Sequence, residues 1–426
     1  MVDSPVDSPV RFCDVSALEI LDSRGNPTVQ VTLTDHAGRR TVSGVPAGAS
    51  TGSREAVELR DGDPKRYAGK GVTKAVAAVQ GEIADLVRSK PWSDLEELDE
   101  ALIELDGTSN KSRLGANAIL GVSMAAARAF ASSAPLWEYL TPHGVAPRLP
   151  VPHFNVLNGG VHAPNDLDFQ EFMLAPIGAP TFAEALRAGA TIYKSLRSEL
   201  SSRGEATGLG DEGGFAPNIS SPEEVLTLMT RAIEDAGYTP GASGVAIAMD
   251  PASSEFYRDG TYHVAGETLT SDDLIDRYER IAADFPVWSL EDGLAEGDWD
   301  GWVRLTERLG DRLQLVGDDI FVTNPTIIAQ AIDRGIGNAA LIKLNQIGTV
   351  TETLRAQALC RRHGYTQMVS HRSGETTDTF IADLAVATGC GELKSGAPAR
   401  GERVAKYDRL LEIESAAGRL PYGLDR

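Results

Sequence analysis

Cysteine is scarce in this sequence of 426 residues, and its three cysteines stand far apart. Cys13, Cys360 and Cys390 have neither the close spacing of a zinc site nor the even number of a disulfide framework. The class of small secreted proteins stabilised by disulfides is therefore excluded. We expect a protein of a reducing compartment, and specifically of the cytoplasm.

Long apolar runs are absent as well. No apolar stretch approaches the roughly 18 residues that a membrane-spanning helix needs, so we expect no membrane partner. The opening sequence MVDSPVDSPV has neither the basic region nor the apolar core of a signal peptide, so we expect no secretory leader. Its repeated VDSP predicts a disordered tail.

Basic residues are outnumbered, with 40 Lys and Arg against 61 Asp and Glu and a net charge of -21. This acidity argues against nucleic acid or an anionic membrane surface as a partner. It does not exclude an anionic small-molecule substrate, because bound divalent cations can reverse the local field.

The length exceeds what one hydrophobic core usually supports, so we expect more than one domain. Residues 1–14 are predicted to be a disordered tail. Strand patterns followed by helical periodicity predict an α+β domain over residues 15–144, which ends in the proline-rich joint TPHGVAPRLPVP. Residues 145–426 then form a second, larger domain.

Six short apolar runs in the larger domain each end in a charged or ionisable residue. They are VAIAMD, PVWSLE, LQLVGD, AALIK, QMVSH and GELK, ending at Asp250, Glu291, Asp318, Lys343, His371 and Lys394. After a first interval of 41 residues, the run ends are 23 to 28 residues apart, which suits one strand and one helix per repeat. Parallel strands with polar carboxyl ends are typical of an α/β fold of the (β/α) barrel type, with its active site on that face.

A polar residue at a strand end is often only the beginning of a loop or the cap of the next helix. Three carboxylates in series are harder to explain in this way, and hard oxygen ligands suit Mg²⁺. We therefore predict a metal site at Asp250, Glu291 and Asp318. Lys343 and Lys394 follow apolar residues, where solvated lysines are less expected. Two nearby ammonium groups and a divalent cation would lower a lysine's pKa, as a catalytic base requires.

Two glutamates outside the metal set, Glu171 in FQEF and Glu212 in GDEGG, are candidate acids. A partly desolvated glutamate has a raised pKa and can donate a proton. The tripeptide His371-Arg372-Ser373 offers donors that suit a phosphate or carboxylate, although alone it would be weak evidence. A base, a metal and an acid together favour removal of a proton beside a carboxylate, followed by loss of a leaving group.

That arrangement matches the known pattern of the enolase superfamily, a Lys or His base with Mg²⁺. Longer motifs go further, and the chain from about Val15 to Ile413 strongly resembles the enolase (phosphopyruvate hydratase) family. The motifs include DSRGNPTV, GASTG, LGANAILGVS, NVLNGGVH, QEFM, GDEGGFAPN, SLEDGLAE, VGDDIFVTNP, LIKLNQIGT and SHRSGET. The resemblance implies an N-terminal α+β capping domain and a (β/α)8 barrel with an irregular ββαα start, whose second strand is antiparallel.

The resemblance also implies the chemistry, which is reversible dehydration of 2-phosphoglycerate to phosphoenolpyruvate. Asp250, Glu291 and Asp318 would hold the first Mg²⁺, and Ser50 in GASTG would reach a second ion that arrives with substrate. Lys343 would be the base at C2.

The remaining implied roles lie around the substrate. Glu212 would protonate the departing C3 hydroxyl, with Glu171 and His162 beside it. Arg372 and Ser373 would bind the phosphate. His371 would lie close to them, Lys394 would bind the carboxylate, and Gln170 would support the site.

Departures from the family pattern leave alternatives open. Ala47 stands where a serine is usual and Thr377 where an acid is common, so a paralogue that acts on a related phosphate or phosphonate acid, similar to carboxyphosphonoenolpyruvate synthase, is a second hypothesis. Leu18, Thr191 and Glu412 replace charged residues at positions that resemble the family's dimer interface, so we expect a homodimer of uncertain strength and leave a higher oligomer open. A non-catalytic binding or structural role is the third and most remote hypothesis.

Overall fold

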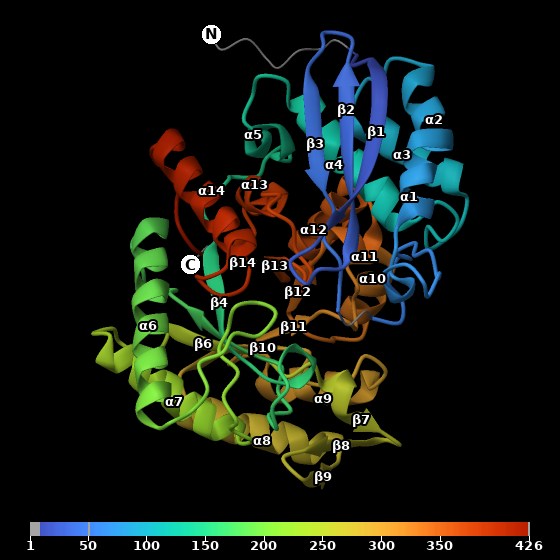
Figure 1. The fold of residues 1–426 in the computed structure, drawn as a ribbon. Coiled ribbons are helices and arrows are strands. Elements are labelled where there is room, and N and C mark those ends of the chain that lie inside the picture. Colours follow the sequence, from blue (N-terminus) through green and yellow to red (C-terminus); the bar gives the residue numbers. More distant parts are fainter. Residues whose placement is uncertain (1–8, 50–51, 425–426) are drawn as a thin grey trace.

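The computed structural model describes residues 9–49 and 52–424, and the chain begins there with a three-stranded antiparallel sheet (Figure 1). Its strands are β1 (Phe12–Leu21), β2 (Pro27–Asp35) and β3 (Arg40–Gly44). Alternation along β2 buries Val29, Val31 and Leu33 completely.

The prediction of a disordered tail over residues 1–14 is wrong for its last residues. Strand β1 already includes Phe12, Cys13 and Asp14, because Phe12 pairs with Asp35 of β2 and buries its ring. Residues 1–8 of the tail lie outside the described part of the chain. The boundary between the two domains near residue 145 stays a prediction.

Helices follow the first sheet and cover it, as the periodicity predicted. They are α1 (Thr73–Ala78), α2 (Ala84–Ser89), α3 (Leu95–Asp106), α4 (Ala116–Ala131) and α5 (Leu136–Leu140). Helix α4 is built from small residues and packs closely on β2 and β3. A Cβ atom at Gly121 would lie 2.6 Å from Val31 Cγ2, so glycine permits this approach.

A closed eight-stranded barrel forms the rest of the molecule, which confirms the predicted fold class. Its strands are β4 (Val151–Asn158), β5 (Glu171–Ala175), β6 (Ala246–Asp250), β10 (Val287–Glu291), β11 (Gln314–Gly317), β12 (Ala339–Ile342), β13 (Thr366–Ser370) and β14 (Gly391–Lys394). Strand β5 is antiparallel to both of its neighbours, and the other pairs are parallel. The irregular opening expected from the family resemblance is therefore present.

Helices surround the barrel, and a small antiparallel sheet lies beside it (Figure 1). The helices are α6 (Phe182–Ser202), α7 (Pro222–Asp235), α8 (Ser271–Asp284), α9 (Trp299–Leu309), α10 (Pro325–Asp333), α11 (Leu344–Ile347), α12 (Val350–Arg362), α13 (Phe380–Thr388) and α14 (Gly401–Ala417). The sheet comprises β7 (Tyr257–Arg258), β8 (Thr261–Val264) and β9 (Glu267–Leu269). Among the described residues, no helix is both long and apolar enough to cross a bilayer.

The N-terminal part contacts the carboxyl end of the barrel strands through specific hydrogen bonds. Ala47, just after β3, exchanges main-chain hydrogen bonds of 2.8 and 2.9 Å with Gly374, which follows β13. Farther out, the Thr351 N–H donates to Asp99 Oδ2 at 3.0 Å. These contacts bring the loop after β3 to the end of the barrel where the polar strand ends gather.

Candidate active site

The barrel brings the six predicted strand-end residues to one end of its interior. Asp250, Glu291 and Lys394 are the last residues of β6, β10 and β14. Asp318, Lys343 and His371 directly follow β11, β12 and β13. These strands run parallel, so their carboxyl ends meet at the same end of the barrel, and the predicted convergence is present. Five of the six, all except Glu291, line a small cavity of about 30 Å³.

Lys394 is the centre of a buried carboxylate cluster. Its Nζ lies 3.0 Å from Asp250 Oδ2 and 2.9 Å from oxygens of both Glu291 and Glu171. Burial alone would lower the pKa of Lys394, but these three carboxylates raise it well above its usual range. Burial and the neighbouring Asp250 charge raise the pKa of Glu291 well above its usual range.

Lys343 makes a very short ion pair with Asp318, through Nζ and Oδ2. Burial opposes the charged lysine, but Asp318 raises the pKa of Lys343 overall. The lowered pKa that we expected for a base depends on a divalent cation beside the lysine, and it stays a prediction. Gln346 Nε2 holds the other Asp318 oxygen at 2.8 Å.

The donor set fits a divalent cation. Beyond the three predicted carboxylates, Asp292 and Asp319 bring ligand atoms within 4.8 Å of those of Asp318. Burial, together with the charge of Asp318, raises the pKa of Asp319 to about 8. Carboxylate oxygens in this number are the ligands that Mg²⁺ prefers. Ser50, the predicted ligand of a second ion, lies outside the described residues.

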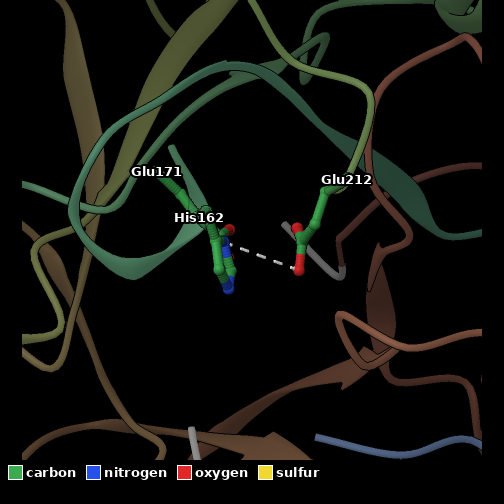
Figure 2. Close-up of side chains that lie close together, drawn as sticks. All are labelled: His162, Glu171 and Glu212. Atoms are coloured by element: carbon green, nitrogen blue, oxygen red, sulfur yellow. Dashed lines mark ion pairs between the residues drawn. The ribbon is translucent and has the colours of Figure 1, made fainter. Parts of the chain in front are cut away.

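The residues predicted to supply the catalytic acid form a cluster. It consists of His162, Glu171 and Glu212, whose ligand atoms lie within 4.8 Å of one another. His162 Nδ1 lies 3.4 Å from Glu171 Oε1 and 3.8 Å from Glu212 Oε1. Figure 2 shows Glu212 reaching toward His162 from a separate loop. The two glutamates are therefore close enough to share a proton-transfer role.

The two glutamates differ in acidity. Burial, reinforced by the charge of Glu212, raises the pKa of Glu171 well above its usual range. Burial would also raise the pKa of Glu212, but the neighbouring imidazoles of His371 and His162 lower it overall. Desolvation therefore does not decide the pKa of Glu212, and of the two carboxyl groups Glu171 is the one whose surroundings favour the protonated form.

The tripeptide after β13 also lines the cavity. His371 Nε2 lies 3.1 Å from Glu212 Oε2, and burial lowers the pKa of His371 to about 4, so its imidazole is neutral near pH 7. Arg372 pairs with Glu55 from the loop after β3. Ser373 Oγ accepts a hydrogen bond from Arg24 Nη1 at 3.0 Å. Gln170 also lines the cavity.

Sequence reasoning missed several polar residues that hold the predicted ones. Asn155 Nδ2 donates to Glu212 Oε2 at 2.9 Å. Asp292 accepts hydrogen bonds from the main-chain N–H groups of Asp318 and Asp319, both at 2.9 Å. Glu55 and Gln346 belong to the same group. Position next to a predicted residue could have identified Asp292, which follows Glu291 directly.

Comparisons with known proteins agree with this geometry. A family model described as "Enolase, N-terminal domain" matches residues 13–140, and one described as "Enolase, C-terminal TIM barrel domain" matches residues 146–422. The sequence is 56% identical over 408 residues to a protein named Enolase from Rubrobacter xylanophilus, an alignment that covers 95% of this chain and 94% of that relative. The chain therefore belongs to the enolase family.

Proposed function

We propose that this chain catalyses the reversible dehydration of 2-phospho-D-glycerate to phosphoenolpyruvate, a step of glycolysis and gluconeogenesis. It is a lyase that acts with Mg²⁺ on a phosphorylated carboxylic acid. The single observation that carries the residue assignment is the placement of Lys343 and the pair Glu171 and Glu212 around one cavity lined by carboxylates and Arg372. A base and an acid on different walls of one cavity suit an elimination.

Lys343 is the proposed base that removes the proton from C2 of the substrate. In the structure its ammonium is paired with Asp318. This ion pair must be weakened before the amine can act as a base near neutral pH. Asp250, Glu291 and Asp318 would hold one Mg²⁺ and Ser50 a second, and bound Mg²⁺ would supply positive charge beside the substrate carboxylate and phosphate. An ion held by Asp318 would lower the pKa of Lys343.

The acid side completes the elimination. Glu171, Glu212 and His162 together hold the proton that the departing C3 hydroxyl takes. We assign its final donation to Glu212 and its storage to Glu171, because the pKa of Glu171 is the raised one of the two. Asn155 and His371 hold Glu212 in place through contacts of 2.9 and 3.1 Å.

The remaining residues anchor the substrate. Arg372 and Ser373 would bind its phosphate, and Lys394 its carboxylate once the ammonium is shared with the incoming anion. Gln170 and His371 support the walls between them. All of these side chains line the same cavity.

The departures at Ala47 and Thr377 do not favour the paralogue hypothesis. Ala47 is joined to Gly374 by two main-chain hydrogen bonds, which do not involve its side chain. Thr377 is exposed. Neither residue is among those that line the cavity.

We further propose a cytoplasmic homodimer. Three free cysteines suit a reducing compartment. Leu18 and Leu21 of β1 are 60% and 57% exposed, which suits a surface that a second copy covers. Glu412 is bonded to Arg409 at 3.1 Å within its own helix. Light scattering on the purified chain measures its oligomeric state, and a monomer at micromolar concentration would contradict this proposal.

The experiment that tests the activity follows the absorbance of the phosphoenolpyruvate double bond with purified protein, Mg²⁺ and 2-phosphoglycerate. We expect a turnover of at least about 10 per second, lost on adding EDTA and restored by excess Mg²⁺. A rate orders of magnitude lower, with the metal still bound, would overturn the proposal in favour of a paralogue acting on another phosphorylated or phosphonate acid.

A further inference from the structure

Glu55 has no role in the assignments above, yet it is bonded to the proposed phosphate ligand. Arg372 Nη1 donates to Glu55 Oε2 at 3.0 Å, and Nη2 donates to Oε1 at 3.2 Å. The side chains of Arg372 and Glu55 are only 4% and 7% exposed. A bidentate pair fixes the plane of the guanidinium, and its burial makes separation of the two charges unfavourable.

Glu55 is itself held by groups other than the arginine. The Gly52 N–H donates to Glu55 Oε1 at 3.0 Å, and Gln346 Nε2 approaches the same oxygen at 3.4 Å. The next residue, Ala56, donates its N–H to the Gln346 carbonyl at 2.8 Å. Because Gln346 also donates to Asp318, Glu55 is fixed to the same framework as a proposed metal ligand.

The guanidinium of arginine has two edges that can each bind two oxygens. Glu55 takes the edge formed by Nη1 and Nη2, and Asn345 Oδ1 accepts from Nη1 at 3.0 Å. The second edge, formed by Nε and Nη2, has the geometry that matches two phosphate oxygens. A carboxylate fixed on the first edge therefore sets the direction of the second.

We propose that Glu55 is a positioning residue for the phosphate group of the substrate and acts through Arg372. The inference rests on the proposed function, because it takes Arg372 as the phosphate ligand. Glu55 does not touch the substrate in this account. Its effect is on the binding of phosphate rather than on proton transfer.

Glu55→Gln tests the proposal, because glutamine keeps the shape but loses the charge and one acceptor oxygen. With inorganic phosphate as the probe and calorimetry as the measurement, we expect the Kd to rise about tenfold. Loss of a negative charge alone would tighten anion binding, so a lower Kd would show that Glu55 competes with phosphate and would overturn the proposal. An unchanged Kd would overturn it as well.

Steady-state kinetics give a second measurement. For Glu55→Gln we expect the KM for 2-phosphoglycerate to rise about tenfold with kcat changed less than about threefold, as expected when ground-state binding is lost. A fall in kcat at unchanged KM would mean that Glu55 supports the metal site at Asp318 rather than phosphate binding, and it would overturn the proposal. Glu58→Gln is the matched control, since Glu58 is on the same segment but pairs with Arg60 at 2.6 Å.

A double-mutant cycle shows whether Glu55 acts through the arginine. In an Arg372→Gln background, Glu55→Gln should leave the phosphate Kd unchanged, and a further change there would overturn the proposal. If Glu55→Gln fails to fold by circular dichroism, Glu55→Asp replaces it, with a smaller rise in Kd expected. Should the wild-type chain bind phosphate through Arg372 but not convert 2-phosphoglycerate, the proposed function fails while the phosphate measurements still decide the role of Glu55.

Discussion

Strand β14 has two buried ionisable residues inside the barrel, and their surroundings differ: one has charged partners and the other has neutral partners. At its carboxyl end, Lys394 is surrounded by carboxylates at 2.9 to 3.0 Å. Two residues earlier, Glu392 is completely buried and bonded to neutral groups, Gln314 Nε2 at 2.5 Å and Trp288 Nε1 at 3.4 Å. One end of the barrel interior holds charge by pairing it, and the other surrounds its carboxyl group with neutral donors and so favours the protonated form.

The difference follows from what surrounds each group. Burial opposes the charged form of both, but at Lys394 the neighbouring carboxylates raise the pKa well above its usual range. At Glu392 burial dominates and raises the pKa to about 7. Paired charges can be rearranged when ions and an anionic substrate arrive, whereas a neutral hydrogen-bonded carboxyl group offers them nothing. The carboxyl end is therefore the end suited to chemistry.

The largest expected effect comes from removing the base at the charged end. Lys343→Ala should reduce exchange of the substrate C2 proton by at least about 10³-fold, since no other group would accept that proton. Deuterium exchange followed by NMR measures this step directly. Mg²⁺ binding, measured by calorimetry, should survive as the control, and retained exchange would remove Lys343 from the base role.

The next largest effect separates the two halves of the reaction. Glu212→Gln should slow dehydration by about 10² to 10³-fold while C2 exchange partly survives, because glutamine cannot donate the proton that the hydroxyl takes. Measuring phosphoenolpyruvate formation and C2 exchange on the same preparation gives both numbers. If both fall equally, the stepwise assignment is wrong. Asp211→Asn, on the adjacent residue, is the matched control.

The fold was predictable where local pattern decides it. Apolar runs ending in polar residues at regular intervals located six of the eight barrel strands. The antiparallel direction of β5 came only from the family resemblance, because the direction of a strand depends on its partners. The predicted C-terminal boundary of the tail was wrong, because strand β1 begins at Phe12, whose ring is buried, before the strand pattern read from the sequence begins.

The candidate site was predictable in position but not in electrostatics. Strand-end placement identified Lys343 and His371, since the end of a strand is set by local sequence. The direction of the Lys343 and Glu212 pKa values depends on which side chains face them, Asp318 in one case and His371 in the other. Those contacts join distant segments, so no local pattern reveals them.

The smallest expected effect concerns the neutral end and its dependence on pH. The folded pKa of Glu392 is about 7 against an ordinary 4.5, so the folded state binds the proton more tightly than the unfolded chain. The protonated Glu392 carboxyl group makes its full contribution to the free energy of unfolding below pH 4.5, and this contribution is lost as the pH rises to 7. Linkage then gives a loss of about 3 kcal/mol in the free energy of unfolding over that window.

Glu392→Gln should remove this loss, because glutamine stays neutral at every pH. Urea unfolding at several values between pH 5 and 8 measures it as the difference between wild type and variant, with Glu307→Gln, the same change at an exposed site, as control. Parallel pH profiles of wild type and variant would contradict this prediction. His153 is the neighbouring titratable group, with its Nε2 3.5 Å from Glu392 Oε1, but burial lowers its pKa to about 4, so it stays neutral over this range and does not take the proton from Glu392.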